Sequence, residues 1–92
     1  MPLLSDDEIE RRMDDVPEWR REGDAITRQF KFGDFTGSVD FVNRITPPAE
    51  EMNHHPDIAI SWNKVGLTLS THSEGGLTEN DFELATRIDS MA

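Results

Sequence analysis

The chain has 92 residues, of which 35% are hydrophobic, which suffices for one small core and a single domain over residues 1–92. It contains no cysteine, which excludes disulfides, thiolate-bound zinc and thiol chemistry. Nineteen acidic residues against nine basic ones give a net charge of -10, the wrong sign for a protein that binds nucleic acid through phosphates.

Two features of the sequence bear on where the protein works. Residues 1–4 lead into acidic residues and lack the basic and apolar regions of a signal peptide, and residues 65–73 are too short and polar to cross a membrane. We therefore expect a cytoplasmic protein without membrane contact. Ten of the acidic residues are aspartate and only two of the basic ones are lysine, which suits a salty cell interior because salt screens charge repulsion.

The first predicted element is a helix. Ser5 and Glu8 have the spacing of a capping box, so we expect the helix to run from about residue 6 to residue 14 and to end before Pro17. Its apolar residues recur at helical intervals: Ile9, Met13 and Val16.

A hairpin follows over residues 19–32. The sequence Glu-Gly-Asp at residues 22–24 is a turn signal. After this turn, every second residue is apolar with one polar exception, which predicts a strand: Ile26, Arg28, Phe30 and Phe32.

A second helix begins after Asp34, whose side chain can cap it. We expect its core-facing stripe to be Phe35, Val39, Val42 and Ile45, with Phe41 beside it. Pro47 and Pro48 predict an interruption, because proline removes a helical hydrogen bond. Since Thr46 can cap a further turn or two through Met52, we expect a kinked helix.

The second half of the chain switches to strands and then back to a helix. Ile58, Ile60 and Trp62 share one face, and beyond a turn near residues 63–64 a second strand carries Val65, Leu67 and Leu69. Gly75 and Gly76 end this hairpin. Thr78 and Asp81 can cap a final helix with the apolar stripe Phe82, Ala85, Ile88 and Met91.

The predicted order is helix, hairpin, helix, hairpin, helix. Short turns between paired strands favour an antiparallel sheet, and the helices then cover one face of it. The fold class is therefore α+β, a four-stranded antiparallel sheet with three helices packed on one face, in the order α-β-β-α-β-β-α.

The three histidines of the chain all lie in its second half, at positions 54, 55 and 72. A turn near residue 63 places the residues before Ile58 and those after Leu69 at the same edge of the sheet. His72 shares parity with Thr68 and Ser70 and therefore projects from the polar side of its strand. We expect the three imidazoles to be neighbours at one site.

Two acidic residues are candidates for orienting these histidines. Glu50 lies four residues before His54, one helical turn away, and Asp81 lies in the first turn of the last helix. His55 precedes Pro56 and is biased to an extended conformation, so its side chain and that of His54 point in opposite directions.

Other chemistries can be assigned to the same residues. His54, His55, His72 and Glu50 offer three nitrogens and one oxygen to a metal ion, but an extended His-His-Pro segment turns the two adjacent rings apart. Ser70 and Ser73 flank His72 as possible nucleophiles, but the spacing of a nucleophile elbow is missing.

The sequence resembles the pterin-4a-carbinolamine dehydratase family. The resemblance rests on residues 50–56 (EEMNHHP), Trp62, residues 70–72 (STH) and Asp81, at the spacings typical of that family. It extends over nearly the whole chain through the first hairpin and the start of the second helix: Trp19, residues 23–26, Arg28, Phe30, Phe32 and residues 34–35. Pro47 and Pro48 depart from the family, in which a continuous helix leads into the His-His-Pro segment.

The resemblance implies a hydro-lyase that removes water from a 4a-hydroxytetrahydropterin to give quinonoid dihydropterin. It implies no cofactor and no metal, the fold described above, and a homodimer or homotetramer. By position, His54, His55 and His72 are the catalytic histidines. Pro56 and residues 71–74 (Thr71, His72, Ser73 and Glu74) would line the pterin, while Glu50 and Asp81 would support the histidines.

Two other functions remain open. Family members in animals also act as dimerisation partners of a transcription factor, so a protein-binding role is the first alternative, and it predicts an exposed apolar helix face. The second is an enzyme that acts on another pterin, such as one of molybdenum-cofactor metabolism.

Overall fold

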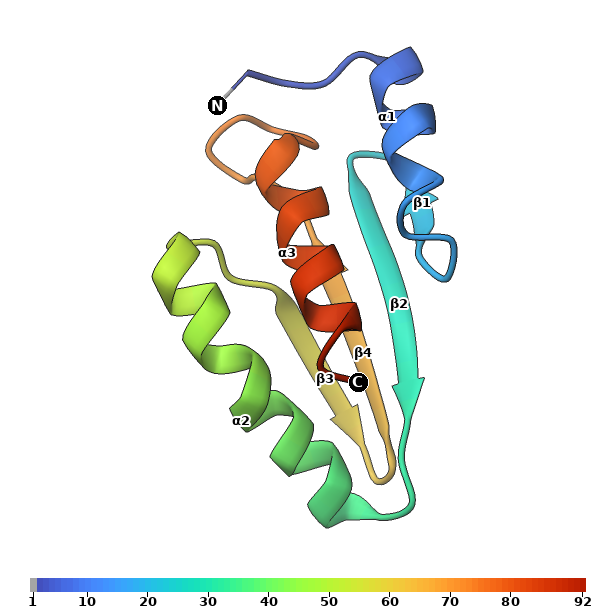
Figure 1. The fold of residues 1–92 in the computed structure, drawn as a ribbon, viewed down its shortest axis with the longest axis vertical. Helices are drawn as coiled ribbons and strands as arrows, with labels where there is room; N and C mark the ends of the chain where they lie inside the picture. Colours follow the sequence, from blue (N-terminus) through green and yellow to red (C-terminus); the bar gives the residue numbers. More distant parts are fainter. Residues whose placement is uncertain (1) are drawn as a thin grey trace.

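A four-stranded antiparallel sheet, with its helices on one face, organises residues 2–92, the part of the chain that the computed structural model describes (Figure 1). The elements are α1 (Asp6–Met13), β1 (Arg20–Glu22), β2 (Ala25–Lys31), α2 (Phe35–Met52), β3 (Asp57–Ser61), β4 (Lys64–Leu69) and α3 (Glu79–Asp89). The strands lie in the order β1-β2-β4-β3. The predicted fold class and element order are confirmed. Within residues 2–92, no helix has the length and apolarity needed to span a membrane.

The capping box predicted for α1 is present. Ser5 Oγ accepts a hydrogen bond from the backbone N–H of Glu8 at 3.2 Å, and Glu8 Oε1 accepts one from the backbone N–H of Ser5 at 3.0 Å. The backbone and side chain of Ser5 stabilise the carboxylate and lower the pKa of Glu8. The helix ends at Met13, one residue before the predicted boundary, and buries Ile9 against the core.

The centre of the core lies between β2, β4 and the helices. Its strand residues are all buried: Ile26, Phe30, Val65, Leu67 and Leu69. Arg28, the polar residue predicted on this face, donates from Nη1 to Asp89 Oδ1 of α3 at 2.8 Å. Trp19 Nε1 donates to the same oxygen at 2.8 Å. The arginine is tolerated because α3 supplies its counterion.

The core-facing stripe of α2 differs from the predicted one. Its buried residues are Ser38, Phe41, Ile45, Pro48 and Ala49. Phe35 is 55% exposed, and Val39 and Val42 lie at the margin of the buried face. Phe41 is at the centre, with its ring centroid 4.7 Å from that of Phe30. The prediction placed the stripe about a fifth of a turn away, because apolar residues are present on both sides of Phe41.

The interruption predicted at Pro47 and Pro48 does not occur, and α2 is one unbroken helix through both residues. These prolines leave the carbonyls of Asn43 and Arg44 without their helical donors. Both residues are exposed, so water can supply the missing hydrogen bonds. The helix therefore continues to Met52 and delivers residues 53–56 to the edge of the sheet.

The turn between β3 and β4 consists of Trp62 and Asn63, because Ser61 pairs with Lys64. It lies one residue earlier than predicted, so Trp62 belongs to the turn rather than to the face of β3. Trp62 has a φ of 53°, in the left-handed region that residues other than glycine rarely adopt. Its carbonyl accepts a hydrogen bond from Ser38 Oγ at 2.8 Å, which ties the turn to α2.

Candidate active site

An open hollow of about 240 Å³ lies next to the C-terminal ends of α2 and β4. Asp57 pairs with Thr68, so the start of β3 and the end of β4 meet at one edge of the sheet. The hollow is lined by Asn53, His54, His55, Ser70, Thr71, His72 and Ser73. The structure thus brings the three histidines to one site, as their spacing about the hairpin predicts.

Asn53 directs the two adjacent histidines to different places. It ends α2 with a φ of 49°, a left-handed conformation that asparagine adopts more readily than most residues. The side chain of His54 then turns inward and is only 9% exposed. That of His55 stays outward and is 54% exposed. The expected divergence of the two rings is present.

His54 pairs with Asp81 of α3, with Nε2 2.6 Å from Oδ1. The other carboxylate oxygen, Oδ2, accepts from Thr71 Oγ1 and from the backbone N–H of Thr78, both at 2.9 Å. Asp81 is completely buried. With Oδ2 taken up by these two donors, Oδ1 is the atom that accepts the Nε2 proton of His54 and fixes the tautomer of that ring.

Glu50 contacts His55 and not His54, which corrects the pairing predicted from helical spacing. Glu50 Oε2 lies 3.2 Å from His55 Nε2, and both side chains are more than half exposed. The spacing of four residues fails because Asn53 leaves the helical conformation before His54 is reached. Asp81, the other candidate, therefore takes the place beside His54.

His72 has its own carboxylate neighbour, Asp57, which the sequence did not reveal as a site residue. His72 Nε2 and Asp57 Oδ2 are 4.0 Å apart, and both side chains are more than 70% exposed. The signal for Asp57 is its position as the first residue of β3, opposite the end of β4. Each of the three imidazoles thus faces a different carboxylate, and the three pairs range from buried to exposed.

The residues expected to line a ligand have different positions. Ser73 lines the hollow, Glu74 is exposed outside its wall, and Pro56 lines a neighbouring hollow. Thr71 lines the hollow but is only 7% exposed, and its hydroxyl donates to Asp81. Thr71 therefore supports the site through its contact with the buried Asp81.

The two other chemistries considered for these residues find little support in the geometry. Ser70 Oγ donates to the carbonyl of Asp24 at 2.8 Å, so its proton points away from His72. Among residues 2–92, no three histidine, aspartate or glutamate side chains are placed to hold one metal ion.

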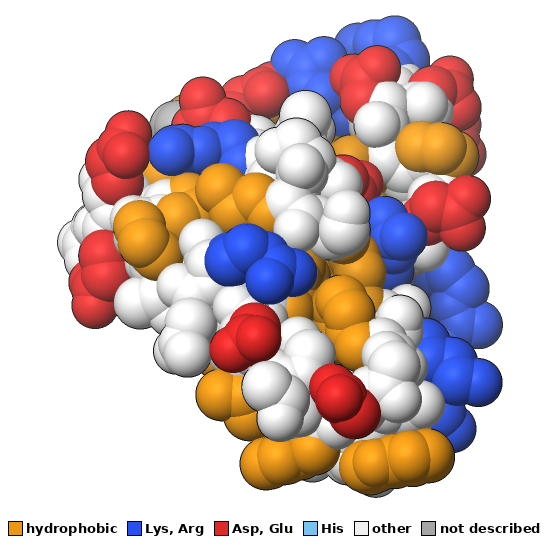
Figure 2. Space-filling view, turned by 60° about the horizontal axis from the view of Figure 1, so that its bottom comes forward, with side chains coloured by type: hydrophobic (Ala, Val, Ile, Leu, Met, Phe, Trp, Pro, Cys, Tyr) orange, Lys and Arg blue, Asp and Glu red, His pale blue; other side chains and the backbone are white. Residues whose placement is uncertain are grey.

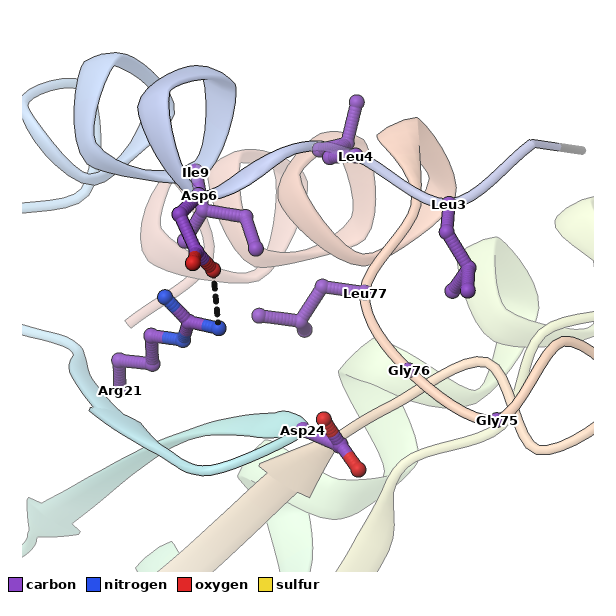
Figure 3. A pocket seen from close by; sticks show the side chains of 9 residues that line it. All are labelled: Leu3, Leu4, Asp6, Ile9, Arg21, Asp24, Gly75, Gly76 and Leu77. Carbon is purple, nitrogen blue, oxygen red and sulfur yellow. Dashed lines mark hydrogen bonds and ion pairs between the residues drawn. The ribbon is translucent and has the colours of Figure 1, made fainter.

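The loop over residues 70–77, which carries His72, is held from behind by the N-terminal segment (Figure 3). The backbone N–H of Leu4 donates to the carbonyl of Leu77 at 2.9 Å. Gly76 lies so close to Leu3 that a Cβ atom there would be 3.0 Å from Leu3 Cδ2. A small hollow of about 140 Å³ remains between them. A larger residue at position 76 would require the exposed Leu3 side chain to shift by a few tenths of an ångström.

An open hollow walled by three imidazoles with carboxylate partners, on an α+β fold of this order, defines a class of protein suited to proton transfer on a small ligand. The family model described as pterin 4 alpha carbinolamine dehydratase matches residues 2–91. The chain therefore belongs to the pterin-4a-carbinolamine dehydratase family, as its motifs predict.

Relatives and solved structures agree with this assignment. A protein of Sulfolobus acidocaldarius, provisionally named a pterin-4-alpha-carbinolamine dehydratase, is 49% identical over 88 residues, which are 96% of this chain and 97% of that protein. The crystal structure of a transcriptional coactivator/pterin dehydratase from Brucella melitensis has a TM-score of 0.93 at 35% identity, over 98% of both chains. A pterin dehydratase-like protein identified as a RuBisCO assembly factor of the alpha-carboxysome has a TM-score of 0.70 at 27% identity, over 82% of this chain and 89% of that one.

Proposed function

We propose that the protein is a hydro-lyase that removes water from a 4a-hydroxytetrahydropterin and releases quinonoid dihydropterin. The observation that carries the proposal is the meeting of His54, His55 and His72 at one hollow in a member of this family. In the reaction the bond from C4a to the hydroxyl oxygen breaks, the oxygen gains a proton, and a ring nitrogen loses one. No electrons are exchanged with a second reactant, so the proposed step needs no oxidant or reductant.

The two proton transfers are assigned to His54 and His72, one as acid and the other as base, because histidine does either near neutrality. Asp81 accepts the Nε2 proton of His54 and holds its ring in place. The exposed His72 can exchange its proton with water between turnovers. His55, held by Glu50, is proposed to bind and polarise the pterin.

The remaining site residues have supporting roles in the proposal. Ser73 lines the hollow that would hold the ring, Pro56 lines the hollow beside it, and Glu74 stands at the outer rim. Thr71 supports His54 through Asp81 rather than by contact with the pterin. The physiological pterin is biopterin-like or belongs to another pathway such as molybdenum-cofactor metabolism, and rates with each class of pterin distinguish the two.

A direct assay tests the proposal. Purified protein is mixed with chemically generated 4a-hydroxytetrahydropterin, and the absorbance change of dehydration is followed. The control is the double variant His55→Ala/His72→Ala. We expect acceleration by the parent and little by the double variant. Equal rates for parent, double variant and buffer contradict the proposed function.

A second candidate function, protein binding, is favoured by exposed apolar residues at the sheet edge and the start of α2. Phe35 and Trp62 are 55% and 67% exposed, and Ile58 and Ile60 of the edge strand β3 are also exposed. Figure 2 faces the end of the molecule where α2 begins and β3 turns into β4, and it shows apolar side chains gathered there with no histidine in view. We propose that this surface serves a homodimer or homotetramer, or a protein partner.

The two functions are separable by experiment, because the hollow and this end of the molecule lie at opposite ends of the hairpin of β3 and β4 (Figure 1). Sedimentation of the parent and of a Phe35→Ser/Trp62→Ser variant reports the role of the surface in self-association. We expect the variant to sediment as a smaller species while it retains dehydratase activity. An unchanged species removes this surface from the proposed interface.

A further inference from the structure

The loop over residues 70–77 carries His72 between two buried anchor residues, Thr71 and Gly76. The two anchors are paired, because the backbone N–H of Thr71 donates to the carbonyl of Gly76 at 2.8 Å. Residues 72–75, which lie between them, are all exposed. The place of His72 at the hollow therefore depends on how the two ends of this loop are held.

Two segments from the start of the chain hold the ends of the loop. At its first residue, Ser70 Oγ donates to the carbonyl of Asp24, in the turn between β1 and β2, at 2.8 Å. At its last residue, the carbonyl of Leu77 accepts from the backbone N–H of Leu4, in the N-terminal segment, at 2.9 Å. The loop can keep one position only while this turn and the N-terminal segment keep theirs.

The side chain of Arg21 in β1 joins these two segments to each other. Its Nε donates to the carbonyl of Gly23 in the turn, and its Nη2 donates to Asp6 Oδ1, both at 3.0 Å. Asp6 is the first residue of α1 and directly follows the N-terminal segment. Arg21 therefore closes a ring of contacts that runs from the turn to the loop, the N-terminal segment, α1 and back. Figure 3 shows this ring around the hollow of about 140 Å³, with the Arg21–Asp6 pair as the dashed line.

From this arrangement we infer that Arg21 is a positioning residue, which holds the loop over residues 70–77 so that His72 faces the ligand. The inference rests on the proposed function and deepens it, because it names a residue outside the catalytic hollow on which proton transfer by His72 depends. The side chains of Arg21 and Asp6 are 36% and 85% exposed. Loss of so exposed a pair should therefore favour opening of the ring of contacts by roughly two- to fivefold.

The first test compares Arg21→Gln with Arg20→Gln, a matched control. Arg20 is the preceding residue of β1 and pairs with Glu22 of the same strand, at 3.2 Å. Amide hydrogen exchange is measured by NMR at Leu4 and Thr71, whose N–H groups bond to the two residues at the end of the loop. We expect exchange at both amides to be roughly two- to fivefold faster in Arg21→Gln and parental in Arg20→Gln.

The second test asks whether Arg21 acts through His72. Dehydration of 4a-hydroxytetrahydropterin is measured for Arg21→Gln in the parent and in a His72→Ala background. We expect kcat to fall about 10-fold in the parent with KM unchanged, because a small displacement of a catalytic group slows proton transfer. In the His72→Ala background the same change should have no effect, because the side chain that Arg21 positions is absent. Arg21→Lys keeps the positive charge beside Asp6 and should restore most of the loss.

Parental exchange at Leu4 and Thr71 in Arg21→Gln overturns the inference. An equal loss of kcat in both backgrounds also overturns it, because Arg21 then acts on a group other than His72. The same holds if Arg20→Gln reproduces the effects, which then come from the loss of any positive charge on β1. If the parent itself does not accelerate dehydration, the proposed function fails, and exchange is read together with the NMR resonances of the His72 imidazole. Faster exchange with shifted resonances then supports the positioning role, and unshifted resonances overturn it.

Discussion

Nε2 of His54 lies 2.6 Å from Oδ1 of Asp81, although 27 residues separate the two in the chain. The same carboxylate accepts the hydroxyl of Thr71 and the backbone N–H of Thr78. One buried side chain therefore joins an imidazole at the end of α2, the start of the loop that carries His72, and the first turn of α3. The proposed chemistry depends on this junction.

Replacement of Asp81 by asparagine should separate the electrostatic role of this carboxylate from its structural role. The amide oxygen can still accept from Thr71 and Thr78, but the amide nitrogen then faces His54 and selects the other tautomer. We expect the dehydration rate to fall by roughly 10² to 10⁴, as when an orienting carboxylate is removed from a histidine. Stopped-flow rates, together with the melting temperature, check this.

Asp89→Asn is the matched control on the same helix. Asp89 accepts from Trp19 and Arg28 and does not contact a histidine. Its loss should lower the melting temperature and leave the rate near the parental value. An Asp81→Asn enzyme that stays within a few-fold of the parent rate contradicts the assigned role.

Thr71→Val should destabilise the fold as well as the site. Valine has nearly the same shape but lacks the hydroxyl, so one oxygen of a fully buried carboxylate loses a donor. We expect a loss of about 1–3 kcal/mol in the free energy of unfolding by urea, together with a reduced rate. Thr71→Ser retains the donor and should restore most of both. A serine variant as impaired as the valine variant shows that the methyl group, not the hydroxyl, matters.

The histidines should differ in their effect on stability. His54→Ala and His72→Ala should each lower the rate by roughly 10² to 10⁴ if each side chain transfers a proton. His72 is exposed, so its replacement should change the free energy of unfolding by less than about 0.5 kcal/mol. His54→Ala leaves the buried Oδ1 of Asp81 without its hydrogen-bond partner and should be clearly destabilising. Parental rates in both variants exclude the proposed mechanism.

The cap of α1 should make stability depend on pH in the acid range. The pKa of Glu8 is lowered from 4.5 in the folded chain by its hydrogen bonds to Ser5, so its carboxylate stabilises the fold above the unfolded pKa. That stabilisation is lost as the pH falls through the lowered pKa. The difference in melting temperature between the parent and Glu8→Gln should therefore be present at pH 7 and shrink below about pH 4. Glu10→Gln, on the same helix but without a cap bond, should show no such change.

The net charge of -10 should make the fold more stable in salt. Repulsion among nineteen acidic side chains is screened once the Debye length falls to a few ångströms. We expect the melting temperature to rise between 0.1 M and 1 M potassium chloride. A melting temperature that stays constant or falls excludes adaptation of this composition to a salty interior.

Local patterns were sufficient to predict most of the fold. The capping box of Ser5 and Glu8, the alternation in both hairpins and the glycines at the turns each act over a few residues, so they are readable in order along the chain. The meeting of His54, His55 and His72 also followed, because a hairpin with a short turn places its two ends together. The core-facing residues of α2 were predicted incorrectly, because burial on that helix depends on the elements packed against it. Pro47 and Pro48 were wrongly expected to interrupt the helix, because solvent access to the carbonyls also depends on those elements.

What only the tertiary structure decided is which carboxylate serves which histidine. Helical spacing favoured Glu50 for His54, but the left-handed Asn53 turned His54 toward Asp81 and left Glu50 to His55. Asp57 became the neighbour of His72 only through the register of β3 on β4. The sequence by itself determined the elements and the edge where the histidines gather. Which carboxylate pairs with each histidine depends on the left-handed conformation of Asn53 and on contacts between distant segments. Neither produces a periodic pattern in the sequence.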